Sequence, residues 1–147
     1  MAFRYWIGVA IAASLLALAP VSAEENEQAW DQAKVTQLAT DFATEAGQVR
    51  QQLRLQGNAV EGFGQSRNDY VLSDQLRLIS QEARHLSRQL GDGKGRDETF
   101  PVYRRLRLLI RDAQETARRT EMVEQVTDKI AAARATLEKL EPYYPDA

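Results

Sequence analysis

Residues 72–90 read LSDQLRLISQEARHLSRQL, with apolar residues at alternating spacings of four and three. The members of this stripe are Leu72, Leu76, Ile79, Ala83, Leu86 and Leu90. Such spacings place side chains on one face of an α-helix, and their regular alternation forms a heptad seam of the kind found in coiled coils. Ser66 and Asp69 form a helix start signal before the stripe, and Gly91 is a helix end signal after it. The segment therefore predicts an amphipathic helix that buries one face.

The same helical spacing continues on both sides of this segment. One stripe lies within 26–56, a second begins around Thr99, and a third covers 123–140. Their apolar residues are Val35, Leu38, Phe42, Ala46, Val49 and Leu53, then Val102, Leu106, Leu109, Ile110, Ala113 and Ala117, then Val123, Val126, Ile130, Ala133, Leu137 and Leu140. No segment alternates apolar and polar residues as a half-buried strand would. We therefore expect an all-α protein with turns at the glycine clusters 57–64 and 91–95.

The directions of the last two stripes decide between two all-α arrangements. No glycine or proline separates them, so one long helix is an option. At about 100° per residue, however, the stripe of 106–117 and the stripe of 123–140 point about 150° apart. A straight helix would bury opposite faces at its two ends, whereas a turn near 118–122 lets both stripes face one core. The sequence favours an antiparallel four-helix bundle, and a three-helix bundle with a long, curved last helix is the alternative.

The first 23 residues differ from the rest of the chain. A short basic start with Arg4 precedes an apolar run from Tyr5 to Ala19, and small residues follow in Pro20-Val21-Ser22-Ala23. This pattern is typical of a secretory signal peptide. The apolar run, about 15 residues, is shorter than the roughly 20 that a transmembrane helix needs. We predict cleavage before Glu24, export to the periplasm or the medium, no membrane span after cleavage, and a single helical-bundle domain at 24–147.

Composition excludes several classes of function. The 147 residues include no Cys, so the chain has no disulfide, thiol nucleophile, thiolate metal site or c-type haem attachment. With 19 Lys and Arg against 21 Asp and Glu and no charged tail, a nucleic-acid partner is not expected. The acidic pairs Glu24-Glu25 and Asp97-Glu98 fall at expected helix starts, where a carboxylate stabilises the helix dipole. We predict no catalytic residues and no enzymatic activity.

A cofactor-binding bundle is the alternative class of function. Glu82 and His85 have the Glu-x-x-His spacing of carboxylate-bridged metal bundles, and Asp112 with Glu115 lies at an equivalent place in the next helix. His85 and Met122 are the pair that could hold a haem in a small haem- or metal-carrying four-helix bundle. Such a metal site needs a second Glu-x-x-His pair, but His85 is the only histidine and its helical phase points it away from the seam. We therefore expect no metal site and no cofactor.

Arginine is the most informative polar residue of this chain. Three arginines share one side of the helix at 66–91, and four more recur along the following helix. These are Arg77, Arg84, Arg88, Arg104, Arg107, Arg111 and Arg118. On neighbouring antiparallel helices they would form one guanidinium surface for an anionic protein, lipid headgroups or a cell-wall polymer. The competing interpretation is that they pair with Asp74, Glu82, Asp112 and Glu115 as solvated helix faces.

These observations predict an exported, non-enzymatic helical-bundle interaction or binding protein with an arginine-rich face. Its oligomeric state stays open. At the C-terminus, we expect Tyr143 and Tyr144 to fold back over the ends of the helices, because aromatic rings are better buried.

Overall fold

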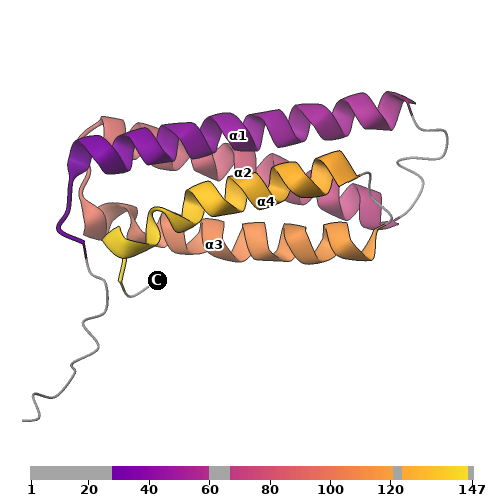
Figure 1. Cartoon of the computed structure of the whole chain (residues 1–147). Helices are drawn as coiled ribbons and strands as arrows, with labels where there is room; N and C mark the ends of the chain where they lie inside the picture. The colour runs from indigo at the N-terminus through magenta and orange to yellow at the C-terminus, as the bar shows by residue number, and fades with distance from the viewer. Residues whose placement is uncertain (1–27, 60–66, 121–123, 146–147) are drawn as a thin grey trace, which may run out of the picture.

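The computed structural model describes residues 28–59, 67–120 and 124–145, and this part of the chain is all-helical (Figure 1). It contains α1 (Gln32–Ala59), α2 (Arg67–Gly91), α3 (Arg96–Arg119), α4 (Glu124–Glu138) and a short 3-10 helix, η1 (Glu141–Tyr143). Consecutive helices run in opposite directions, and α1 packs against α2 and α4 while α3 packs against the same two helices. The prediction of four helices packed around one core, with no strand in the described residues, is confirmed.

The last two stripes belong to separate helices. α3 ends at Arg119, Thr120 has extended backbone angles (φ −100°, ψ 133°), and α4 begins at Glu124. The proposed turn residue Met122 lies outside the described residues. The separation follows from the phase of the two stripes, because each now turns its apolar side toward the same core. The three-helix alternative with a long last helix is therefore not adopted.

Two helix starts differ from those expected. α1 begins at Gln32 rather than near residue 26, and the Asp31 carboxylate accepts the backbone N–H of Lys34 at 3.1 Å as a helix cap. α3 begins at Arg96, three residues before Thr99, and the Gly95 N–H donates to the Glu98 carboxylate at 3.1 Å. In both places a carboxylate that satisfies an amide sets the boundary, whereas apolar periodicity locates only the buried face.

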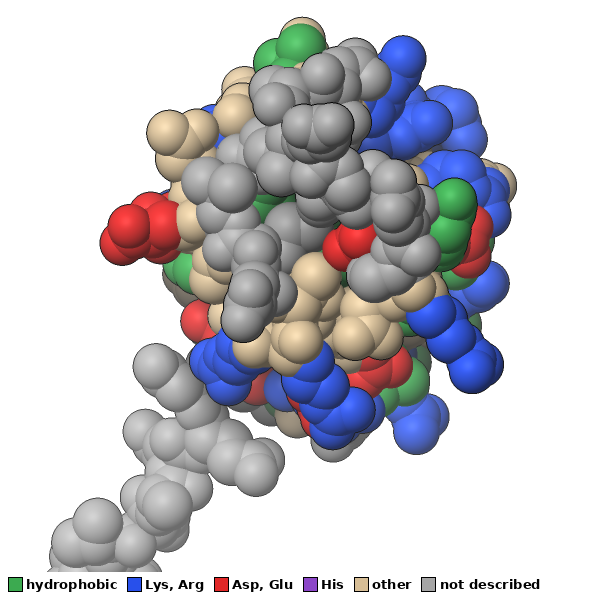
Figure 2. All heavy atoms as spheres, turned by 90° about the vertical axis from the view of Figure 1, so that its right-hand side faces the viewer, with side chains coloured by type: hydrophobic (Ala, Val, Ile, Leu, Met, Phe, Trp, Pro, Cys, Tyr) green, Lys and Arg blue, Asp and Glu red, His purple; other side chains and the backbone are tan. Residues whose placement is uncertain are grey.

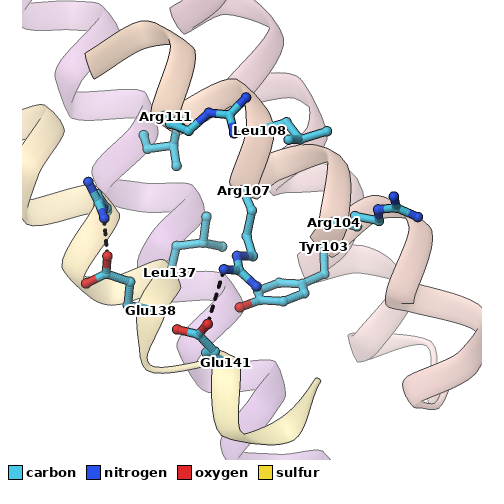
Figure 3. Close-up of a pocket in the computed structure, with 10 residues that line it drawn as sticks. Tyr103, Arg104, Arg107, Leu108, Arg111, Leu137, Glu138 and Glu141 are labelled. Carbon is cyan, nitrogen blue, oxygen red and sulfur yellow. Dashed lines mark hydrogen bonds and ion pairs between the residues drawn. The ribbon is translucent and has the colours of Figure 1, made fainter. Parts of the chain in front are cut away.

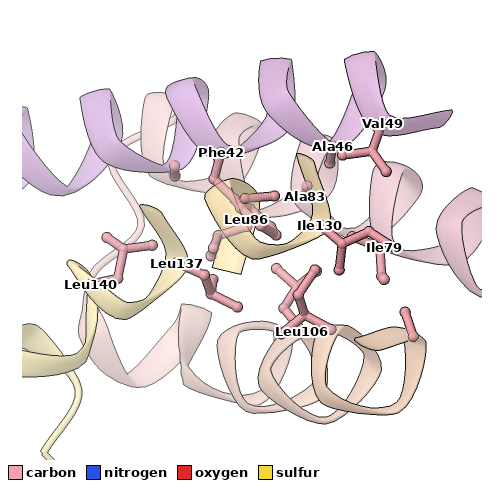
Figure 4. Packing of buried hydrophobic residues seen from close by; sticks show 14 of the residues in the cluster. Phe42, Ala46, Val49, Ile79, Ala83, Leu86, Leu106, Ile130, Leu137 and Leu140 are labelled. Carbon is pink, nitrogen blue, oxygen red and sulfur yellow. The ribbon is translucent and has the colours of Figure 1, made fainter. Parts of the chain in front are cut away.

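Within the described residues the core consists of the predicted stripes with few changes (Figure 4), and Val123 of the last stripe lies outside these residues. All six residues of the α2 seam are at most 2% exposed. On α1, Leu38 lies at the margin of the core and Ala39 takes a fully buried place beside it. Leu109 and Val102 of α3 are also marginal, whereas Tyr103 is fully buried. The bundle therefore buries one continuous apolar face from each helix.

Aromatic rings close one end of the bundle. Tyr143 and Tyr144 are buried, so the prediction that they fold back over the helix ends is confirmed. The Tyr144 ring stacks on Tyr103 with centroids 4.2 Å apart, and Trp30 meets it edge-on at 5.6 Å. The Tyr144 hydroxyl shares a buried 2.8 Å hydrogen bond with the Thr99 hydroxyl. This cluster ties the start of α3 to the segment that follows α4.

A polar clamp holds the turn between α2 and α3 against the start of α1. The Gln32 side-chain amide donates to the backbone carbonyls of Leu90 at 2.7 Å and Lys94 at 3.1 Å. Gly93 adopts φ +84° in this turn, a left-handed conformation that glycine takes without strain. The Leu90 carbonyl also accepts the Gly93 N–H at 3.1 Å, so the clamp adds a second hydrogen bond at the C-terminus of α2.

Candidate functional site

A cleft of about 420 Å³ lies between α3 and the segment formed by α4 and η1 (Figure 3). Four arginines line it: Arg104, Arg107 and Arg111 from α3, and Arg134 from α4. Leu108, Ile110 and Leu137 supply its apolar lining. The cleft therefore combines an apolar base with guanidinium groups from two helices.

The three α3 arginines line the cleft because of their place beside the buried stripe. Tyr103, Leu106 and Ile110 face the core, and Arg104, Arg107 and Arg111 each follow one of these by a single residue. A step of one residue turns a side chain by about 100°, so all three leave the core on the same flank of α3. That flank faces α4, since Gln114 of the same flank accepts a 2.7 Å hydrogen bond from Arg134.

Two carboxylates partly neutralise the cleft. Arg107 Nη2 lies 3.1 Å from Glu141 Oε1, and Arg134 Nε lies 2.6 Å from Glu138 Oε1. Arg111 lies 3.3 Å from its neighbour Asp112, and both side chains are more than 45% exposed, so this contact is worth little. Four guanidinium groups against two carboxylates on the lining leave the cleft positive.

Tyr103 gives the cleft a buried hydrogen-bond donor. Its side chain is fully buried, yet its hydroxyl has no hydrogen-bond partner among the described residues. Burial raises the pKa of this phenol far above its ordinary value, and the nearby Arg107 only partly offsets the rise. The group is thus a neutral O–H donor at every physiological pH. In Figure 3 it lies beside the Arg107 guanidinium and near Glu141.

The structure divides the arginine surface that the sequence predicts. Arg104, Arg107 and Arg111 come together in the α3–α4 cleft, but Arg84 lines a separate groove between α1 and α2. Between these two places α2 packs against α3, and there Arg105 lies 3.1 Å from Glu82. The single surface shared by α2 and α3 is therefore corrected to two grooves on opposite flanks of this helix pair.

The other predicted arginines lie outside both grooves. Arg77 pairs with Asp74 at 2.8 Å on the surface of α2. Arg88 and Arg118 are exposed and line neither groove. The four carboxylates that the sequence proposed as arginine partners are all paired: Asp74 with Arg77, Glu82 with Arg105, Asp112 with Arg111, and Glu115 with Arg119. Some arginines of this chain therefore form ion pairs on the surface, and others line the α3–α4 cleft.

Arg134 is the cleft residue that sequence reasoning missed. It follows the buried Ala133 by one position, just as the α3 arginines follow their own core residues. This flank position was readable from the sequence, but its meaning depends on which helix stands beside it. Only the packed bundle shows that the arginine flanks of α3 and α4 face each other.

The residues of the cofactor hypothesis do not gather in the described residues. His85 is exposed, and Glu82 is engaged by Arg105 on the side of α2 that meets α3. Asp112 and Glu115 contact arginines of their own helix, and Met122 lies outside the described residues. Across 28–59, 67–120 and 124–145, no three His, Asp or Glu side chains are grouped to hold a metal ion.

Comparison of the chain with known protein families, with curated proteins and with solved structures finds no match. In the part of the chain that the structure describes, no helix combines the length and apolar character that crossing a bilayer requires.

Proposed function

We propose that this protein is an exported, non-enzymatic binding protein, an antiparallel four-helix bundle that recognises an acidic protein segment through the α3–α4 cleft. The observation that carries this proposal is that four arginines from two helices line one cleft, which also holds a buried hydroxyl with no partner among the described residues. Guanidinium groups present several N–H donors in a fixed fork, which matches carboxylates. A cleft with these donors attracts carboxylates by its positive charge and orients them by the fixed geometry of the N–H donors.

The chemistry of the expected partner follows from the contacts that the cleft already makes. Arg107 and Arg134 are each engaged by a carboxylate of this chain, Glu141 and Glu138. Arg104 and Arg111 are both exposed, and Arg111 has only a weak contact with Asp112. Partner carboxylates bind Arg104 and Arg111 separately, and another one competes with Glu141 for Arg107 and accepts a hydrogen bond from the Tyr103 hydroxyl. The site thus favours a segment with several acidic residues over a single carboxylate.

The compartment is proposed from the first 23 residues alone. The basic start, the apolar run and the small residues before Glu24 form the pattern of a secretory signal, and these residues lie outside the described ones. Acidic segments of envelope proteins are the partners available there. Lipid headgroups and cell-wall polymers are the competing anions.

The test measures binding of a fluorescently labelled glutamate-rich peptide by anisotropy. The native protein is compared with Arg104→Gln/Arg111→Gln, which removes two guanidinium groups from the cleft. The matched control is Arg88→Gln/Arg118→Gln, which removes the same charge from exposed positions outside both grooves. Because charge-assisted hydrogen bonds are worth about 1.5–3 kcal/mol, the cleft variant should bind at least about tenfold more weakly.

Rising salt should weaken binding to the native protein, since exposed charges are screened over about 8–10 Å at physiological ionic strength. The control variant should keep most of the affinity of the native protein. Equal losses in the cleft variant and the control, with both proteins folded, would refute the cleft and leave only a general charge effect.

A further inference from the structure

A second groove of about 420 Å³ lies between α1 and α2, on the flank away from the α3–α4 cleft. Arg50 and Arg54 of α1 and Arg84 of α2 line it, together with Gly47 and Ser80. None of the described residues that line this groove is acidic. In this respect it differs from the α3–α4 cleft, where Glu138 and Glu141 already neutralise two arginines.

The register of the two helices explains why the groove is open. The Thr40 hydroxyl and the Ser87 hydroxyl lie 2.9 Å apart, so these residues face each other across the α1–α2 pair. In an antiparallel pair, Gly47 then faces Ser80, seven residues along each helix. A Cβ built on Gly47 would meet no atom within 4 Å. Two small residues therefore face each other here, and the space above them is surrounded by long basic side chains.

The three arginines of this groove have no counter-charge among the residues that the structure describes. No carboxylate in the described residues forms an ion pair with Arg50, Arg54 or Arg84, although each ion pair between described residues involves an arginine. Like charges on neighbouring helices repel one another, so their approach costs free energy until an anion binds. Figure 2 shows Lys and Arg side chains gathered along one side of the bundle, extending down from the top, where α1 lies.

We propose that the α1–α2 groove binds a phosphate group through Arg50, Arg54 and Arg84. A phosphate monoester carries up to two negative charges and three free oxygens, which suit three guanidinium groups that have no carboxylate beside them. A single carboxylate has one charge and two oxygens, and it would leave part of the groove uncompensated. The phosphate belongs either to a soluble phosphate compound or to a phospholipid headgroup, and the experiment separates these sources.

The first arm of the experiment uses inorganic phosphate with the full chain. Thermal unfolding is followed by circular dichroism at increasing phosphate, with ionic strength held constant by sodium chloride. A ligand that binds only the folded state raises Tm by an amount that grows with the logarithm of one plus the ratio of the free ligand concentration to Kd. Phosphate should raise the Tm of the native protein, and Arg50→Gln/Arg84→Gln should require at least about tenfold more phosphate for the same shift.

Two controls separate this site from the rest of the surface. Arg88→Gln/Arg118→Gln removes the same charge outside both grooves and should keep the phosphate response. Arg104→Gln/Arg111→Gln should also keep it, so failure of the acidic-peptide site and failure of the phosphate site are distinguishable. An equal loss of the phosphate response in all three double variants, or a full response in Arg50→Gln/Arg84→Gln, overturns the proposal.

A second substitution tests the groove without removing an arginine. Gly47→Glu adds a carboxylate where the groove is open, and Gly47→Gln adds a side chain of nearly the same shape without the charge. The glutamate variant should have the higher Tm in the absence of phosphate, because its carboxylate neutralises the arginines. It should also lose most of the phosphate response that the glutamine variant keeps. Equal behaviour of the two variants contradicts a charge-selective groove.

The second arm measures sedimentation with vesicles of phosphatidylglycerol and of phosphatidylcholine. If the source is a lipid headgroup, a larger fraction of the native protein binds phosphatidylglycerol than phosphatidylcholine. Arg50→Gln/Arg84→Gln then loses this preference, and Arg88→Gln/Arg118→Gln keeps it. A phosphate response in solution without such a difference on vesicles identifies a soluble phosphate compound. If Arg50→Gln/Arg84→Gln keeps both the Tm shift with phosphate and the binding to phosphatidylglycerol, the phosphate site is refuted.

Discussion

Replacing Tyr103 by Phe should stabilise the protein, although the residue is fully buried and stacks on Tyr144. The substitution removes only the hydroxyl, which has no hydrogen-bond partner in the described residues. The ring stays in place, so its 4.2 Å stacking on Tyr144 is preserved. The net effect is therefore the removal of a desolvated polar group from the interior.

Its partner ring provides the matched control for the size of this effect. Leaving a buried hydroxyl unsatisfied costs about 1–3 kcal/mol, whereas an ordinary buried hydrogen bond contributes about 0.5–1.5 kcal/mol. Tyr144→Phe removes a satisfied hydroxyl that bonds Thr99 at 2.8 Å, so it should lower the free energy of unfolding by about 1 kcal/mol. Tyr103→Phe should raise it by about 1 kcal/mol. The two variants differ from the native protein by the same single oxygen atom and should change stability in opposite directions.

Thermal and urea unfolding, followed by circular dichroism, measure both effects. For a domain of this size, about 1 kcal/mol corresponds to a change in Tm of roughly 3–5 °C. The same Tyr103→Phe variant should bind the acidic peptide more weakly than the native protein, because the cleft has lost a donor. A gain in stability together with a loss of affinity is the signature of a polar group kept for binding.

A loss of stability in Tyr103→Phe as large as that in Tyr144→Phe would refute this reasoning. It would mean that a water molecule or a side chain satisfies the Tyr103 hydroxyl in solution. Unchanged peptide affinity in Tyr103→Phe would remove this hydroxyl from the binding site and leave the arginines as its only donors.

Three further predictions concern the core, alkaline pH and export. Leu76→Asp should abolish the helical circular-dichroism spectrum, because Leu76 is 2% exposed and an unpaired buried charge costs several kcal/mol. The control Arg104→Glu, at an exposed position, should keep the spectrum. A native Tm for the Leu76 variant would contradict the packing described. Burial raises the pKa of Tyr103 and of Tyr144 above the value of about 10 in the unfolded chain. Stability against urea should therefore be constant with respect to these groups below about pH 10 and then fall by up to about 1.4 kcal/mol per pH unit per tyrosine. A urea midpoint that stays flat from pH 9 to pH 11.5 would contradict this. The protein isolated from the cell envelope should begin at Glu24 by intact mass, and a membrane-embedded form that keeps Met1 would show an anchor instead.

The sequence was sufficient to predict the helices and the faces that they bury. Alternating spacings of four and three mark the buried side of α2, because one turn of an α-helix takes 3.6 residues and every side chain has a fixed direction. The same arithmetic separates α3 from α4, since stripes about 150° apart cannot both face one core along a straight helix. The burial of Tyr143 and Tyr144 was also predictable, because aromatic rings next to the helix ends leave water when they pack over those ends.

Helix boundaries were less predictable, since they depend on single hydrogen bonds. Asp31 and Glu98 set the starts of α1 and α3 by accepting backbone amides, and several neighbouring residues were chemically able to do the same. The Gln32 clamp was not predictable at all. It joins α1 to carbonyls of Leu90 and Lys94, some sixty residues away, and nothing local to Gln32 identifies these acceptors.

Tertiary structure alone decided which arginines act together. Periodicity identifies the buried face of a helix, and with it two flanks, but it does not say which neighbouring helix stands beside each flank. Arg104 and Arg111 were predicted to join Arg84, yet they line the α3–α4 cleft together with Arg134, while Arg84 lines the groove between α1 and α2 together with Arg50. The order of the helices around the core makes this assignment, and that order depends on the packing of all four helices at once.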